Sequence, residues 1–212
     1  MKPIETARLL LRAFRRDDFD AFHRIAYDDP EVAPWWTGRT RSAEETRGSF
    51  GRKVEQTPGE PGWLAVTLRD TGELAGGIGL QRWLPDEDTS WLIPEHPDDA
   101  PARDPAALEV ELAYVLGRDY WGRGYATEAA RAVLDYGFRE LGVRRVISPI
   151  NSENVRSIRL AERLGCRIRR NLHPRPSRFR DTPGVMAILD AADRIGGNDP
   201  GDADPEATAP AR

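Results

Sequence analysis

The chain has 212 residues, a formal net charge of −4 at pH 7, and hydrophobic and charged fractions of 39% and 31%. This length and composition predict one globular domain; the apolar runs are too short for a membrane span, and the acidic balance argues against nucleic acid as a partner. A single cysteine, Cys166, excludes an internal disulfide, and the first residues lack the apolar core of a signal peptide, so we expect a cytoplasmic protein.

The first predicted elements are a strand and a helix. Residues 8–12 are typical of a strand, and the apolar spacing over residues 17–27 predicts a helix that Asp17 or Asp18 can cap. The following segment, which contains Trp35 and Trp36, is expected to be irregular.

A second helix and a hairpin are predicted next. Ser42 and Glu45 have the spacing of a capping box and indicate a helix over residues 43–56. Two apolar runs, 62–68 and 74–84, flank a turn signature and predict a β-hairpin. Its second strand is rich in glycine, which indicates a bulge or a close backbone approach.

The middle of the chain combines an insertion with the clearest helix. Residues 85–106 are rich in proline and aspartate and predict a loop. A strand over residues 110–116 follows, and then a glycine-containing turn. Apolar residues at helical spacing predict a helix over 126–141, which Gly142 ends.

The last third of the chain is expected to complete a sheet. Residues 145–150 predict a strand. Because a long helix connects it to the strand over residues 110–116, the two strands are expected to pair in parallel, and a further helix is expected over 154–164. Residues 167–170 and 185–189 can supply two further strands. We expect one domain over residues 1–195 and a disordered tail over 196–212, where large apolar residues are almost absent.

The glycine turn before the long helix is the main chemical motif. Gly122 and Gly124 let the backbone direct its amides to one point, beside the unpaired N–H groups of a helix N-terminus, which suits a pyrophosphate. A dinucleotide fold would need a third glycine in this turn, and the turn would have to follow the first strand of the chain. A P-loop would need Gly-Lys-Ser/Thr. The sequence meets neither requirement.

Three segments carry a resemblance to a known family. Residues 114–129, from Tyr114 through Gly122-Arg123-Gly124 to Ala129, closely resemble the acyl-coenzyme A loop of the GNAT N-acetyltransferases. Residues 151–166 resemble the N-x-x-S helix of that family, and residues 5–12 resemble its opening strand. The likeness is greatest to the branch that includes ribosomal-protein N-terminal acetyltransferases.

The resemblance implies a fold and a cofactor site. The fold would be α+β, with a mixed, splayed, mostly antiparallel sheet of about seven strands flanked by helices. Acetyl-CoA would bind as co-substrate to the turn, to the splayed strand and to the N-x-x-S helix. The residues implied are Gly122, Arg123, Gly124, Tyr125, Ala126 and Thr127 in the turn, the backbone of Tyr114 and Leu116, and Asn154. Arg123 can equally be a solvated arginine, and Asn154 can equally be a simple helix cap.

Acetyl transfer to an amine requires a group that accepts a proton from the ammonium. Glu109 and Glu111 lie two apart on one strand and share a face, so either can serve; the resemblance favours Glu111, and a merely solvated pair is the alternative. The late strand lacks the tyrosine that many members use to protonate the thiolate. Ser157, one helical turn after Asn154, is the substitute we expect, and an ordinary serine on the helix surface is the alternative.

The sequence leaves the acceptor open. Trp35 and Trp36 can wall its site or simply pack in the core. A protein or peptide N-terminus ranks first, a small amine or an aminoglycoside is the alternative, and a non-catalytic acyl-CoA-binding module is the rival outside enzymes. No metal is expected because the histidines lack ligand spacing, and a homodimer is compatible with the family.

Overall fold

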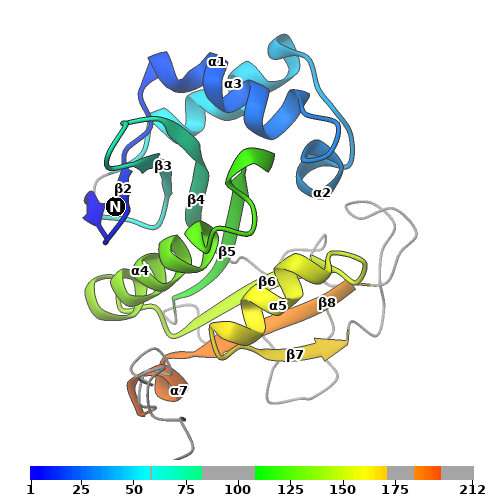
Figure 1. Ribbon diagram of the computed structural model, residues 1–212. Coiled ribbons are helices and arrows are strands. Elements are labelled where there is room, and N and C mark those ends of the chain that lie inside the picture. The colour runs from blue at the N-terminus through cyan, green and yellow to red at the C-terminus, as the bar shows by residue number, and fades with distance from the viewer. Residues whose placement is uncertain (58, 83–107, 171–183, 197–212) are drawn as a thin grey trace, which may run out of the picture.

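The computed structural model describes the whole chain except residues 58, 83–107, 171–183 and 197–212 (Figure 1). Within the described residues, eight strands form one sheet in the order β1-β2-β3-β4-β5-β6-β8-β7. The strands are β1 (Ile4–Glu5), β2 (Leu9–Arg12), β3 (Trp63–Leu68), β4 (Leu74–Arg82), β5 (Glu109–Leu116), β6 (Arg145–Asn151), β7 (Arg167–Arg170) and β8 (Gly184–Asp190).

The described sheet is antiparallel except for one pair of strands. That pair is β5 and β6, which run parallel and are joined through the long helix α4 (Tyr125–Glu140). The expected α+β fold with a mostly antiparallel sheet is confirmed, with one strand more than predicted. The predicted loop over residues 85–106 lies outside the described residues, as does the predicted tail beyond Gly196.

The helices confirm the long periodic segments and depart from the prediction in the short ones. Besides α4, they are η1 (Arg16–Asp18), α1 (Phe19–His23), η2 (Arg24–Asp28), α2 (Ala33–Thr37), α3 (Ala43–Val54), η4 (Arg118–Tyr120), α5 (Val155–Arg163) and α7 (Ala191–Gly196). The helix predicted over residues 17–27 therefore consists of three consecutive helical segments of different pitch, η1, α1 and η2. Trp35 and Trp36 lie in the short helix α2 instead of an irregular segment. None of the described helices has the length and apolarity of a membrane span.

The two predicted helix caps have different outcomes. Ser42 and Glu45 form the predicted capping box of α3, since the Glu45 amide donates to Ser42 Oγ and the Ser42 amide donates to Glu45 Oε2. The prediction that Asp17 or Asp18 caps α1 is wrong. The carboxylate of Asp18 instead accepts from the Arg15 amide and from both terminal nitrogens of Arg12 at 2.7 and 2.8 Å.

The hairpin of β3 and β4 contains the close backbone approach that its glycines predict. A Cβ on Gly76 would lie 2.1 Å from the carbonyl oxygen of Val115 in β5. The register of the hairpin also shifts between Val66 and Thr67, as a bulge requires. Because only a glycine fits there, β4 can lie tightly against β5.

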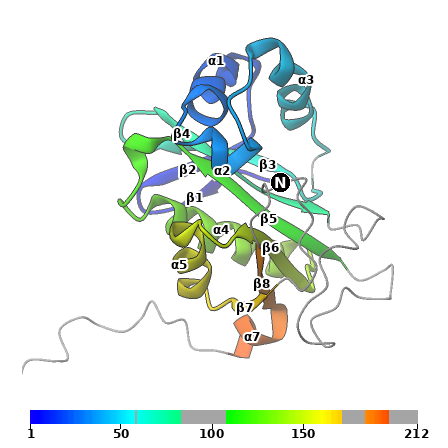
Figure 2. The same ribbon diagram turned by 90° about the vertical axis from the view of Figure 1, so that its right-hand side faces the viewer.

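Helices cover both faces of the sheet (Figure 2), and an apolar layer lies on each face. On one face, alternate residues such as Leu64 and Val66 pack under α4. On the other face, Trp63 and Ala65 contact a phenylalanine cluster of α1, α3 and their connections, made of Phe14, Phe19, Phe22 and Phe50. Alternate side chains of β3 thus pack into the two layers, as in a central strand that is buried on both faces.

β5 and β6 pair at one end only. Their parallel register covers just Glu109–Glu111 of β5 opposite Arg145–Ile147 of β6. Beyond that point β5 continues to pair with β4, and β6 continues to pair with β8. The two strands therefore diverge and leave a gap between the halves of the sheet (Figure 1).

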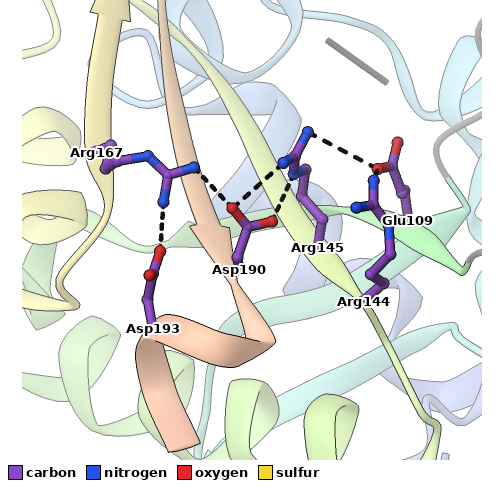
Figure 3. Close-up of polar contacts among 6 residues, drawn as sticks. All are labelled: Glu109, Arg144, Arg145, Arg167, Asp190 and Asp193. Carbon is purple, nitrogen blue, oxygen red and sulfur yellow. Dashed lines mark hydrogen bonds and ion pairs between the residues drawn. The ribbon is translucent and has the colours of Figure 1, made fainter. Parts of the chain in front are cut away.

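A network of charged side chains lies where the two strands are still paired (Figure 3). Arg145, only 4% exposed, donates from Nε to Asp190 Oδ1 at 2.6 Å, and its Nη1 lies 4.0 Å from Glu109. Asp190 also accepts from Arg167 at 2.7 Å, while Arg144 pairs with Glu109. These residues come from β5, β6, β7 and β8 and from the residue just before β6, so the network ties the four strands together at this end.

The electrostatics of Asp190 make this network dependent on pH. Burial by itself would raise the pKa of Asp190, but hydrogen bonds and charge from Arg145 and Arg167 outweigh it and lower the pKa. A carboxyl whose pKa is lower in the folded state stabilises the fold above its unfolded pKa. The stabilisation is lost as the pH falls through the folded pKa, so the network is intact at neutral pH and weakens in acid.

We expect Arg145→Met to lower the free energy of unfolding by about 3 kcal/mol or more, because it leaves the buried carboxylate of Glu109 and the half-buried carboxylate of Asp190 with incomplete pairing. Urea denaturation at neutral pH measures the change. The control is Glu55→Gln, which breaks an exposed ion pair with Arg16 and should change stability by less than about 1 kcal/mol. Similar small effects of both variants would show that the network does not stabilise the fold.

Candidate functional site

A cavity of about 1120 Å³ occupies the gap between the diverging strands. One end is lined by α2, the middle by β5 and β6, and the other end by the glycine turn and α5. The cavity therefore joins the glycine turn to the tryptophan-containing helix through the opening in the sheet.

The glycine turn has the geometry of an anion cradle. Gly122 and Gly124 have φ angles of +73° and +79°, which a residue with a Cβ rarely adopts. The first main-chain bond of α4 runs from the Glu128 amide to the Gly124 carbonyl at 3.0 Å. The amides of Tyr125, Ala126 and Thr127 precede this bond, so α4 itself offers them no acceptor. Together with the positive end of the helix dipole, these amides suit a diphosphate.

The residues of the predicted turn do not all line the cavity. Gly122, Gly124, Ala126 and Thr127 line it, whereas Arg123 and Tyr125 are not among the lining residues. The backbone carbonyl of Arg123 accepts from Arg8 at 2.9 Å, and the ring of Tyr125 lies under the Arg8 guanidinium at 4.6 Å. The structure thus brings together the backbone of the predicted turn but directs two of its side chains elsewhere.

The turn is held by residues that the motif analysis did not identify. Glu128, in the first turn of α4, accepts from Thr6 Oγ1 at 2.6 Å, from the Arg8 amide at 2.8 Å and from Arg8 Nε at 2.7 Å. Hydrogen bonds from Thr6 and Arg8 outweigh the effect of burial, which alone would raise the pKa of Glu128, and lower that pKa. An acidic residue four positions after the helix N-cap was the only sequence signal, and it did not reveal its distant partners.

Every second residue of β5 directs its main-chain N–H and C=O groups toward the edge that faces the opening. The carbonyls of Leu108, Leu112 and Leu116 accept from the Arg144 amide, Ser148 Oγ and Trp121 Nε1, at 2.8, 2.7 and 2.8 Å. Tyr114 lies between Leu112 and Leu116 on the same edge. Its backbone is therefore placed for the predicted strand-like pairing with the pantetheine arm of the cofactor. The Leu116 carbonyl, in contrast, already accepts from Trp121 Nε1.

The start of α5 forms the wall opposite β5. Asn154 caps this helix, since its Oδ1 accepts from the Ser157 amide at 3.2 Å. Both residues line the cavity, together with basic side chains of the same helix such as Arg156, which lies 4.6 Å above the ring of Trp121. The capping role of Asn154 is thus observed, and it leaves the residue at the edge of the cavity.

The two candidate carboxylates are separated by the structure. Glu111 lines the cavity, close to the point where β5 and β6 separate. Glu109 is 5% exposed, pairs with Arg144 and Arg145, and is not among the lining residues. The expectation that both share a face of the cleft is corrected, because the adjacent arginines hold Glu109 in the closed part of the sheet.

The lining also includes two tryptophans and the cysteine. Trp35 and Trp36 line the α2 end, and Trp36 packs edge-on against Trp63 with ring centroids 5.4 Å apart. Burial raises the pKa of the Cys166 thiol to about 11, so it stays protonated near neutral pH. The described residues contain no cluster of three or more His, Cys, Asp or Glu side chains placed to hold a metal ion.

The site fits coenzyme A in its chemistry. The amide cradle suits the diphosphate, the open edge of β5 at Tyr114 suits an amide-containing arm, and Arg156, Arg159 and Arg163 give the α5 wall a positive charge. The cavity also extends beyond the opening to α2, which leaves room for a second substrate.

Comparisons with known proteins agree with this arrangement. A family model described as acetyltransferase (GNAT) domain matches residues 8–167. The chain is 30% identical over 162 residues to the uncharacterized protein YkkB of Bacillus subtilis (strain 168), covering 76% of this chain and 82% of that protein. A GNAT-family acetyltransferase from Bacillus anthracis superimposes with a TM-score of 0.70 at 23% identity, covering 89% and 98% of the two chains. A spermidine N-acetyltransferase from Vibrio cholerae, in complex with CoA and spermine, has a TM-score of 0.66 at 16% identity, covering 90% and 99%.

We expect Gly124→Val to abolish measurable binding of coenzyme A, because a β-branched residue cannot hold φ near +79° and its Cβ would lie 3.3 Å from Arg8. Isothermal titration calorimetry measures the binding, and thermal unfolding without ligand checks the fold. The matched control is Gly142→Val, which imposes similar strain at φ +66° beyond the other end of α4. Equal affinity in both variants would contradict the cradle.

Proposed function

The chain belongs to the acetyltransferase (GNAT) family and is an acyl-CoA-dependent N-acetyltransferase, and from this premise we propose how it acts. The acceptor is the primary amine of a peptide or protein N-terminus, or of a small molecule with a similar amine. This amine attacks acetyl-CoA directly in a ternary complex. The proposal includes membership of the branch that contains ribosomal-protein N-terminal acetyltransferases.

The observation that carries the proposal is the continuity of the cavity. Its glycine-turn end can hold the diphosphate of acetyl-CoA, its α2 end is walled by tryptophan, and Glu111 of β5 lines the part between them. The two ends meet where β5 and β6 separate. Two substrates that enter from opposite ends would meet there, so no covalent enzyme intermediate is needed and positioning supplies much of the catalysis.

Glu111 is the proposed proton acceptor. Acetyl-CoA supplies the activated thioester, and an ammonium group must lose a proton before its nitrogen can attack. Glu111 accepts that proton directly or through water, and its charge also attracts the ammonium. Ser157, on the opposite wall, donates a hydrogen bond to the sulfur as it leaves.

The charges at the α2 end support a peptide-like acceptor. Arg41 lines the same cavity as Glu111 and the two tryptophans. A peptide N-terminus offers an amine to the carboxylate and carbonyl oxygens to the guanidinium, so both charges gain a partner. A polyamine offers only N–H donors and positive charge, which Arg41 would repel.

An acceptor panel tests the proposed function. Thiol release from acetyl-CoA is followed with a dipeptide amide, with the same dipeptide blocked at its amine, with spermidine and with kanamycin. We expect the highest kcat/KM for the free dipeptide amine and no turnover for the blocked one. A higher kcat/KM for spermidine or kanamycin would instead assign the acceptor class of polyamines or aminoglycosides.

Paired glutamine variants test the proton acceptor. Glu111→Gln should lower kcat about 10²-fold or more near neutral pH, and the defect should shrink as the pH approaches the pKa of the acceptor amine. Glu109→Gln should lower stability and leave kcat per folded molecule nearly unchanged, because Glu109 lies outside the cavity. A larger loss of kcat in Glu109→Gln than in Glu111→Gln would reverse the assignment.

A further inference from the structure

Three arginines form a row along α5 at the mouth of the cavity. Arg156, Arg159 and Arg163 have the spacing i, i+3 and i+7, which places them on one face of the helix. All three are exposed and line the cavity, and we call them the α5 arginine face. The apolar side of the helix, with Leu160 and Leu164, packs into the core layer under α4. Packing therefore does not explain why the row is basic.

The charge of the α5 arginine face has no internal counterpart. Within the described part of the chain, no carboxylate forms an ion pair with any of the three side chains, although Glu153 and Glu162 are close in sequence. Like charges three or four residues apart destabilise a helix. The face therefore weakens α5 in the free protein, and a bound anion would offset the repulsion.

The first arginine of the row is fixed beside the glycine turn. Arg156 is the second residue of α5, where the positive end of the helix dipole disfavours a cation. Its guanidinium lies 4.6 Å from the centre of the Trp121 ring, and Trp121 Nε1 donates to the Leu116 carbonyl at 2.8 Å. Trp121 directly precedes Gly122 of the turn. The α5 arginine face thus begins next to the backbone amides that suit a diphosphate.

Coenzyme A carries a second phosphate that the amide cradle does not account for. Its diphosphate joins the pantetheine arm to the adenosine, and a separate phosphate monoester is attached to the 3′ oxygen of the ribose. A phosphate monoester has nearly two negative charges at neutral pH, and guanidinium groups bind it through paired hydrogen bonds. The ribose holds the monoester close to the diphosphate, so a basic surface adjoining the cradle suits it.

We propose that the α5 arginine face binds the 3′-phosphate of coenzyme A and makes the protein selective for coenzyme A over 3′-dephospho-coenzyme A. The inference rests on the proposed function, because it extends the assignment of the cavity to acetyl-CoA. Arg159 is the central residue, since it is one helical turn from both Arg156 and Arg163. A phosphate bound to Arg159 can therefore be shared with either neighbour.

A comparison of two nucleotides tests this assignment. Isothermal titration calorimetry measures the Kd of coenzyme A and of 3′-dephospho-coenzyme A at one ionic strength. We expect the wild-type protein to bind coenzyme A about tenfold more tightly or better, as charge-assisted hydrogen bonds to one phosphate allow. The variant Arg159→Gln/Arg163→Gln should reduce this preference to about threefold or less, with little change in the Kd of 3′-dephospho-coenzyme A. Arg156 stays in place because it also packs on Trp121.

The second nucleotide and a remote variant separate recognition from a structural role. A distorted site would lose affinity for both nucleotides, whereas loss of the 3′-phosphate contact affects coenzyme A alone. The matched control is Arg139→Gln, which removes an exposed charge in the last turn of α4, outside the cavity lining, and should leave both Kd values unchanged. Thermal unfolding without ligand should show no loss of stability in Arg159→Gln/Arg163→Gln, because two repelling charges are removed.

Equal affinity of the wild-type protein for the two nucleotides would overturn the inference. An equal loss of affinity for both in Arg159→Gln/Arg163→Gln would also overturn it, because the arginines would then act on the diphosphate or on the fold. Binding of neither nucleotide would refute the cofactor site together with the proposed function. Selective binding of coenzyme A without acetylation of any amine would leave the inference standing and refute the proposed function alone.

Discussion

The buried guanidinium of Arg145 holds together the end of the sheet from which the cavity opens. It pairs with Asp190 of β8 and lies near Glu109 of β5, so three neighbouring strands are tied where their register is complete. Charged groups in this position are expensive to bury alone, and they are stable because each has a partner. With one end closed by charge, β5 and β6 can diverge over the rest of their length without the halves of the sheet separating.

The divergence exposes the main-chain groups to which we assign cofactor binding. In a continuous sheet, the inner edge of β5 would be satisfied by β6. Here the carbonyls of Leu112 and Leu116 are satisfied by side chains, from Ser148 and Trp121, and Tyr114 remains between them. The same requirement applies to the glycine turn, whose amides precede the first bond of α4. Both ends of the cofactor would thus be met by backbone groups that the fold itself leaves unsatisfied.

The sequence predicts the parts of this fold whose causes are local. The period of the apolar residues and the glycine stops predict α4 and α5, and the glycine-rich strand predicts the close approach of β4 to β5. Contacts between distant segments were not predictable, because one sequence does not show which charges meet. Asp18 binds Arg12 and the Arg15 amide at the start of η1 and makes no cap hydrogen bond to α1, and Glu128 binds Thr6 and Arg8 across more than a hundred residues. The amide cradle was therefore predictable from its glycines, while the side chains that hold it were not.

Glu109 and Glu111 show how two identical side chains on one strand face acquire different environments. They are two residues apart, so strand periodicity gives them the same direction. The difference comes from β6, which is paired beside Glu109 and begins to separate at Glu111. Beside the closed sheet, Glu109 meets Arg144 and Arg145 and is buried; at the opening, Glu111 reaches the cavity. The proposed base must be accessible to the amine, and the point of separation between β5 and β6 gives Glu111, but not Glu109, access to the cavity.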